Sequence, residues 1–305
     1  MKPQPDLICI GAAHWDVIGR ASAPLEPGAD VPGRVTRRAG GVALNIAATL
    51  ARLGLRPAIL SAVGRDAEGD ELAARIATLG IDGRFLARTP AGTTGRYVAI
   101  EAADALVAAV ADARGLEMAG RAILAPLDDG QLASDEHPWA GPVVIDGNLG
   151  TDLLAEIAVS RTFRAADLRI ASAGSGKAAR LRQLLGLENA TVYLNLTEAS
   201  VLAGAAPGDA PAAAAALVAL GARRVLVTDG GRTCADASAA GILTAEPPRV
   251  RVARVTGAGD TFMAAHILAE RQGVDRASAL GAARASGGRS RLRQASQAQT
   301  ATNSA

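Results

Sequence analysis

Short apolar runs alternate with segments of helical spacing along most of this 305-residue chain. Leu7 to Gly11 and Pro142 to Asp146 have the continuous apolar pattern of strands that are buried on both faces. Ala43 to Leu53 has helical spacing and is followed by Gly54, a residue type that commonly ends helices. Such alternation predicts a parallel sheet covered by helices on both faces. The other expected strands are 58–63, 168–171, 192–196 and 224–228, and the other expected helices are 70–79, 151–158, 177–185 and 211–220.

Two regions depart from this alternation. Thr93 to Ile100 and Ala105 to Ala111 are β-compatible runs with no helix between them, which predicts a hairpin or small sheet beside the main domain. A substrate-covering lid and a decoration of the sheet edge both agree with that pattern. From Arg284 onward the chain is rich in Ser, Gln, Thr and Arg and has little to bury, which predicts a disordered tail.

The composition restricts how the chain can bind its partners. A net charge of +2 predicts no strong attraction to nucleic acid. Of the 32 basic residues only Lys2 and Lys177 are lysines, so a phosphate site must use arginine, backbone N–H groups or one of these two. Cys9 lies in an apolar run, where a buried thiol is expected. Neither a targeting signal nor a membrane-spanning run is recognisable, so a cytoplasmic protein without membrane partners is expected.

The most informative motif is VTGAGDTF, from Val255 to Phe262, which leads into an Ala-rich helical segment. Gly257 and Gly259 flank Ala258 and let the backbone turn with exposed N–H groups, and the helix adds its positive end. Together these features predict an anion hole for a phosphoryl group. Asp260 stands at its rim, where a carboxylate could accept a hydroxyl proton. A glycine-rich turn in which Asp260 simply caps the helix explains the motif equally well.

Two further motifs start expected helices. In AGGVALN, paired glycines including Gly41 permit close approach of a ligand, and Asn45 can donate and accept hydrogen bonds. In NLTE, Asn195 and Glu198 are three residues apart after a strand, a spacing that allows contact with Mg²⁺ through water. A capped turn accounts for the first motif and a helix cap for the second almost as well.

Nucleotide binding has one weak candidate and lacks the two common signatures. Thr228 and Gly230 follow a strand, and ligands collect at the carboxyl ends of strands in parallel sheets, although an ordinary turn also fits. The run GSGK, 174–177, resembles part of a P-loop, but Ala171 and Ala178 replace residues that this motif requires. No GxGxxG follows the first strand, so a Rossmann dinucleotide site is not expected.

The order of these motifs resembles the ribokinase-like (PfkB) family of kinases. A GG…N helix start, NxxE, a strand followed by TxGG, and finally GAGD occur in the family's order, and the resemblance extends from about Leu7 to Ala283. It implies an α/β, three-layer ribokinase-like fold with a central, mostly parallel sheet and a small β-lid. Residues 1–283 would form the kinase domain, with the lid at about 13–40 and 92–112, and 284–305 the polar tail.

The resemblance also implies roles for individual residues. Asp260 would be the general base, and the backbone of Gly257, Ala258 and Gly259 would stabilise the transferring phosphoryl group. The implied ATP-binding residues are Asn195, Thr228, Gly230, Gly257 and Gly259; Glu198 and Asn195 would contact Mg²⁺ through water; and Asp16, Gly41, Asn45, Thr94 and Asp112 would bind the acceptor. ATP and Mg²⁺ are the implied cofactors, and the use of a monovalent cation is left open.

Within the family the chain looks most like the pseudouridine kinases. GGVALNIAATLARLG, SAVGRDAEG, the lid residues Thr94, Tyr97 and Asp112, IDGNL and Lys177 carry this likeness. It implies phosphorylation of the 5′-hydroxyl of pseudouridine and, from the family's habit, a homodimer that pairs through the lids.

Two other readings stay open, and one is disfavoured. The acceptor could be ribose, another nucleoside, or a hexose derivative such as a sugar phosphate. The chain could also be a non-catalytic sugar- or nucleoside-binding protein on the same scaffold. An NAD-dependent oxidoreductase is disfavoured because the glycine fingerprint is missing.

Overall fold

A computed structural model of the chain describes residues 4–26, 28–89, 93–102, 105–246 and 257–286. Its centre is an eight-stranded sheet. The six strands from β12 to β4 in spatial order run parallel, while β13 pairs antiparallel with both β12 and β14. In spatial order the strands are β14 (Gly241–Ala245), β13 (Cys234–Ser238), β12 (Arg224–Thr228), β11 (Ala190–Asn195), β10 (Asp167–Ala171), β9 (Pro142–Asp146), β1 (Leu7–Ile10) and β4 (Pro57–Leu60).

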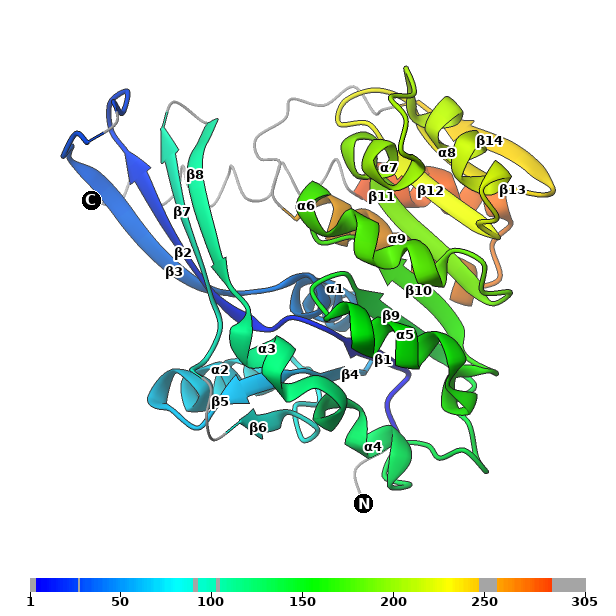
Figure 1. Cartoon of the computed structure of the whole chain (residues 1–305), viewed down its shortest axis with the longest axis horizontal. Helices are drawn as coiled ribbons and strands as arrows, with labels where there is room; N and C mark the ends of the chain where they lie inside the picture. Colours follow the sequence, from blue (N-terminus) through cyan, green and yellow to red (C-terminus); the bar gives the residue numbers. More distant parts are fainter. Residues whose placement is uncertain (1–3, 27, 90–92, 103–104, 247–256, 287–305) are drawn as a thin grey trace.

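Helices cover both faces of this sheet (Figure 1). Along β1 the side chains alternate between two buried clusters, with Ile8 and Ile10 in one and Leu7 and Cys9 in the other. The cluster that contains Leu7 and Cys9 includes residues of α1 (Val42–Arg52), α2 (Ala67–Thr78), α9 (Ala258–Arg271) and the helical residues 276–286.

The cluster that contains Ile8 and Ile10 covers the other face of the sheet. It includes residues of α3 (Arg114–Ala119), α4 (Ala125–Asp128), α5 (Thr151–Val159), α7 (Leu196–Ala203), α8 (Ala210–Ala219) and the 3₁₀ segments Gly120–Leu124, Arg161–Phe163 and Ala179–Leu184. The expected three-layer α/β fold is confirmed.

A second sheet, here called the lid sheet, extends away from the body (Figure 1). Its order is β3 (Gly33–Gly40), β2 (His14–Ala21), β7 (Arg96–Ala102) and β8 (Ala105–Asp112). The register places Asp16 beside both Arg38 and Tyr97, so these three side chains share one face. The hairpin expected from the two β-compatible runs is therefore present as β7 and β8.

Three local expectations need adjustment. The single strand expected at 58–63 is wrong, because the chain changes partners at Ser61, whose carbonyl accepts the N–H of Ala87. The run is thereby divided between β4 and β5 (Ala62–Gly64), which pairs with β6 (Ala87–Thr89). The helix expected at 177–185 begins earlier, as α6 (Ser175–Ala178), and continues as a 3₁₀ segment. Residues 284–286 are helical, and the rest of the expected tail lies outside the described residues.

Within the described part of the chain, no helix has both the length and the apolar character needed to cross a membrane.

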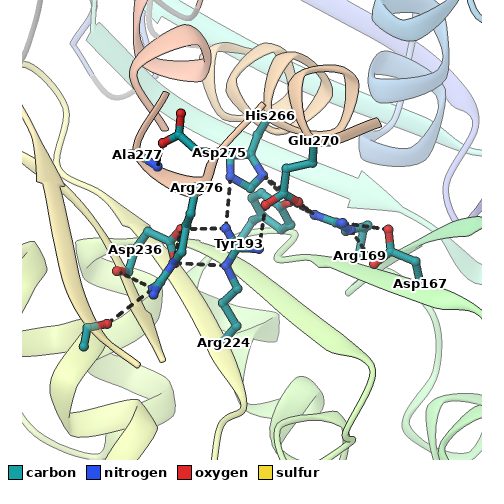
Figure 2. A network of polar contacts seen from close by, with 11 residues as sticks. Asp167, Arg169, Tyr193, Arg224, Asp236, His266, Glu270, Asp275, Arg276 and Ala277 are labelled. Carbon is teal, nitrogen blue, oxygen red and sulfur yellow. Dashed lines mark hydrogen bonds and ion pairs between the residues drawn. The ribbon is translucent and has the colours of Figure 1, made fainter. Parts of the chain in front are cut away.

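A buried network of charges fastens the C-terminal half of α9 to the sheet (Figure 2). Glu270 of α9 accepts hydrogen bonds from Arg169 of β10 and, at 2.6 Å, from Arg224 of β12. Arg224 and Arg276 both form ion pairs with Asp236 of β13 at 2.6 Å. Helix α9 is thus tied directly to β10 and β12, and through Arg224 to β13, by groups that cannot exchange their partners for water without cost.

Two neutral side chains complete this network. The Tyr193 hydroxyl lies 2.8 Å from Nδ1 of His266, and Arg169 donates to the same hydroxyl at 3.0 Å. Burial lowers the pKa of His266 to about 4, so the imidazole is neutral at neutral pH. The three arginines are balanced by Glu270, Asp236 and Asp167, which pairs with Arg169. The network therefore carries no net charge.

Asp236→Asn should destabilise the fold strongly. The Asp236 side chain is fully buried, so its neutralisation leaves Arg224 and Arg276 without their shared counter-charge. We expect the free energy of unfolding to fall by roughly 3–5 kcal/mol, as measured by urea denaturation. Glu188→Gln is the control, because that side chain is 78% exposed in its pair with Arg223 and should cost less than about 1 kcal/mol. Equal effects of the two variants would contradict the anchoring role.

Candidate active site

The residues Gly257 to Asp260 form the start of α9. Gly257 precedes the helix with φ +83°, a left-handed conformation that favours glycine, and provides no side-chain cap. Asp260 is the third residue of the helix rather than its cap, so the simple capping explanation does not describe it. The first N–H groups of α9 together with the helix dipole can therefore stabilise an anion. Val255 and Thr256 of the same motif lie outside the described residues.

Asn45 of α1 meets Asp260 directly. Its Nδ2 donates to Oδ2 of Asp260 at 3.0 Å, across 215 residues of sequence. Helix α1 begins after Gly41, which has φ +106° and whose Cβ position would lie 2.3 Å from the carbonyl oxygen of Ala12. Only glycine fits there, so Gly41 brings α1 close enough for Asn45 to reach the carboxylate. The structure thus brings an expected acceptor residue and the expected base together.

The environment of Asp260 suits a base that works near neutral pH. Burial, helped by the charges of Asp146, Glu198 and Asp16, raises the pKa of Asp260 to about 7, although the Asn45 hydrogen bond lowers it. A general base is most effective when its pKa lies near the working pH. Strong pKa perturbation by burial and neighbouring charges is also typical of functional sites.

Asp16 lies on strand β2 of the lid sheet, and its charge acts on Asp260. It is buried and accepts from Arg38 Nε at 3.2 Å, while His14 Nε2 lies 3.2 Å from its other oxygen. A Cβ at Gly40 would lie 2.3 Å from Oδ1 of Asp16, so any larger residue there would displace the carboxylate. His14 and Arg38 were not expected from the sequence, although His14 lies two residues from Asp16 on the same strand and pairing of β2 with β3 places Arg38 opposite it.

Asn195 and Glu198 form a complete capping box at the start of α7. The Asn195 side chain accepts the N–H of Glu198 at 2.9 Å, and Glu198 Oε2 accepts the N–H of Asn195 at 2.8 Å. Glu198 Oε1 accepts the N–H of Gly174 at 3.0 Å. Each carboxylate oxygen keeps a lone pair after these bonds. The pair therefore fits a role at a hydrated cation, where a bound water is contacted rather than the metal itself.

The turn that follows β12 lies beside this box. Thr228 is the register neighbour of Asn195, so both lie at the carboxyl edge of the sheet. Arg284 donates to the carbonyl oxygens of Gly230 at 3.1 Å and Arg232 at 2.6 Å. The expected nucleotide-side turn is therefore held by a side chain from the helix at 276–286.

Thr94 and Asp112 have partners of their own. The buried Thr94 hydroxyl donates to Asp66 at 2.5 Å and accepts the N–H of Gly64 at 3.1 Å, which joins β5 to α2. Asp112 forms a two-pronged pair with Arg114, which lowers the pKa of Asp112 to about 2. In the described part of the chain, no hydrogen bond links Thr94 or Asp112 to Asp260 or Asn45. Their contact with an acceptor stays a prediction.

Comparison with known proteins identifies similar sequences. The family model described as "pfkB family carbohydrate kinase" matches residues 4–303. An uncharacterized sugar kinase of Escherichia coli is 30% identical over 155 residues, which cover 50% of this chain and 41% of that protein. The pseudouridine kinase of the same organism is 39% identical over 72 residues, which cover 24% of this chain and 23% of that protein. The chain thus aligns with less than half the length of either curated relative.

Solved structures match the fold over nearly its whole length. The ribokinase of Arabidopsis thaliana, complexed with ribose and ATP, superimposes with a TM-score of 0.78 and 21% identity. The match covers 94% of this chain and 92% of that chain. At this identity the match establishes the ribokinase-like fold.

Asp260→Asn should stabilise the protein at alkaline pH. A carboxyl whose pKa is raised on folding favours the protonated folded state, so its ionisation costs stability as pH rises from about 4 through about 7. Above pH 8 the variant should gain free energy of unfolding, by at most about 4 kcal/mol, while at pH 4 the two proteins should be similar. Urea denaturation at both pH values measures this. Equal stability at alkaline pH would show that Asp260 ionises normally.

Proposed function

This chain belongs to the pfkB family of carbohydrate kinases, and we propose that it transfers the γ-phosphoryl group of ATP to a hydroxyl of a small sugar or nucleoside. The observation that carries the proposal is the position of Asp260, at the start of α9 and in contact with Asn45. A base and a set of backbone donors for an anion therefore lie side by side, which is the arrangement that phosphoryl transfer requires.

The reaction follows from these groups. The acceptor hydroxyl attacks the γ-phosphorus, the bond to the ADP oxygen breaks, and the hydroxyl proton passes to the Asp260 carboxylate. Asn45 holds that carboxylate in a fixed orientation through its hydrogen bond. The N–H groups of the first turn of α9 stabilise the negative charge of the phosphoryl group in transfer, and they need no reorganisation because the helix fixes them.

The nucleotide and its cation have candidate residues at the same edge of the sheet. Thr228 and Gly230 lie where the ATP phosphates and ribose would be held, beside Asn195. Asn195 and Glu198 would hold Mg²⁺ through water, because each Glu198 oxygen already accepts one N–H. When bound, Mg²⁺ supplies positive charge that offsets the charge of the phosphates. The use of a monovalent cation stays an open expectation.

Pseudouridine is the acceptor that we favour, with its 5′-hydroxyl as the reacting group. Support comes from the motifs shared with pseudouridine kinases and from the 72-residue match to one of them.

The paired charges at the base of the lid sheet also favour an uncharged acceptor. At the base of the lid sheet, Arg38, Arg96 and Arg114 each pair with a carboxylate, so among the described residues they offer no unbalanced charge for a sugar phosphate. Ribose and other nucleosides are the alternatives.

A homodimer that pairs through the lid sheets is part of the proposal. Val35, Val98, Ile100 and Val110 are exposed on the face opposite to Asp16, where the register places them in adjacent rows. Light scattering should give twice the mass of the chain, and the charge introduced by Val98→Asp with Val110→Asp should yield monomers. A monomeric wild-type protein would contradict this part.

The cytoplasmic location also stays a prediction.

Release of ADP from Mg²⁺-ATP tests the activity, with pseudouridine, uridine, adenosine, ribose and fructose 6-phosphate as acceptors. We expect turnover to be greatest with pseudouridine. Asp260→Ala should lower kcat by about 10²–10⁴-fold with little change in acceptor binding, because only the base is lost. Asn45→Ala should weaken acceptor binding measured by calorimetry, and an unchanged dissociation constant would argue against that contact.

The outcomes separate the alternatives. Preference for another acceptor would retain the kinase and correct the substrate. Near-normal turnover of Asp260→Ala would refute the proposed base. An absence of turnover with every acceptor, together with an absence of ATP binding, would favour a non-catalytic binding protein on this scaffold.

A further inference from the structure

We propose that Asp146 is a positioning residue that fixes Asn45, and through it Asp260. Asp146 does so from the end of strand β9, by acting as the N-terminal cap of helix α1. The link to catalysis rests on the kinase function proposed above, while the capping itself does not. The sequence does not reveal this contact, because 103 residues separate Asp146 from the N–H that it caps.

Helix α1 lacks the usual means of satisfying its first N–H groups. Its N-cap is Gly41, which has no side chain to accept a hydrogen bond, and its first turn contains no acidic residue. The N–H of Leu44 donates to the carbonyl oxygen of Ala12 at 3.3 Å, which accounts for one of the unpaired donors. Another must find an acceptor outside the helix, since buried N–H groups are rarely left unpaired.

The Asp146 carboxylate supplies that acceptor. It lies at the end of β9, is fully buried, and its Oδ2 accepts the N–H of Ala43 at 2.9 Å and of Ala12 at 2.8 Å. Oδ1 accepts the N–H of Asn148 at 2.6 Å. A single carboxylate therefore joins the ends of β1 and β9 to the first turn of α1. A negative charge at the start of a helix also interacts favourably with the helix dipole.

The surrounding glycines show how closely this junction is fitted. A Cβ at Gly11 would lie 2.3 Å from Cγ of Asp146, and a Cβ at Gly41 would lie 2.3 Å from the carbonyl oxygen of Ala12. The junction tolerates no larger side chain at either position without displacement. The start of α1 is thus fixed within the small space that the carboxylate allows.

Asn45 lies two residues beyond Ala43 on this first part of α1, and it holds Asp260. A displacement of the helix start therefore changes the orientation of the base. Among the described residues, Cys9 of β1, Lys177 of α6 and Asp260 of α9 interact electrostatically with Asp146. Lys177 donates at 2.6 Å to Asn148, not to Asp146.

A double-mutant cycle between Asp146 and Asn45 tests the proposal. Asp146→Asn keeps the shape but replaces an acceptor by a donor, and it should lower kcat/KM for the acceptor by about 10-fold or more, the scale of one lost charge-assisted hydrogen bond. In the Asn45→Ala background the same substitution should cost less than about 3-fold, because the contact through which it acts is already lost. Equal losses in both backgrounds would overturn the positioning role.

A matched control and a second measurement separate positioning from folding. Asp209→Ala removes the local cap of α8, where Oδ1 accepts the N–H of Ala212 at 2.8 Å, and should leave kcat/KM unchanged. Hydrogen exchange of the Ala43 and Ala12 amides should be slow in the wild type and accelerate in Asp146→Asn. Rapid wild-type exchange at these amides would overturn the cap, even if no acceptor supports turnover and the kinase proposal fails.

Asp146→Ser, which retains one acceptor oxygen in a smaller side chain, is the second variant. It should also lower kcat/KM, again by less in the Asn45→Ala background. If neither Asp146 variant folds, the residue is a requirement of folding rather than of positioning, and the proposal is refuted.

Discussion

The hydrogen bond between Asn45 and Asp260 is the contact on which the proposed active site depends, because it joins helices from opposite ends of the chain. Neither helix is fixed by this bond alone. Helix α1 is held at its start by Asp146, and α9 is held along its C-terminal half by Glu270 and its arginine partners. The two anchors lie on different parts of the sheet, so the sheet itself sets the distance between the base and its partner.

The two anchors use charge in different ways. Asp146 places one carboxylate against backbone N–H groups, where it also adds negative charge near Asp260. The network beneath α9 is neutral as a whole, so it anchors the helix without adding net charge near the base. The raised pKa of Asp260 thus comes from its own burial and from the nearby carboxylates of Asp146, Glu198 and Asp16, while the Asn45 hydrogen bond opposes it.

The sequence was most informative where function depends on short segments. The alternation of strands and helices predicted the layered α/β architecture, and the family resemblance carried by VTGAGDTF and AGGVALN implied that Asp260 and Asn45 belong to one site. Contacts between distant segments were beyond such reasoning: Arg169 and Glu270 are 101 residues apart and share no motif. The strand expected at 58–63 was wrong for the same reason, since its division at Ser61 depends on a partner strand that local pattern does not reveal.

The proposed site is divided between the body of the fold and the lid sheet. Asp260 and Asn45 lie on helices packed against the central sheet, and the motifs that encode them are constrained by that packing. Asp16 lies on a lid strand, where its partners His14 and Arg38 are set by the pairing of β2 and β3. A change in the lid can alter those partners without moving the base. In the proposed reaction, acceptor choice is therefore physically separable from phosphoryl transfer, and we expect the lid sheet to decide it.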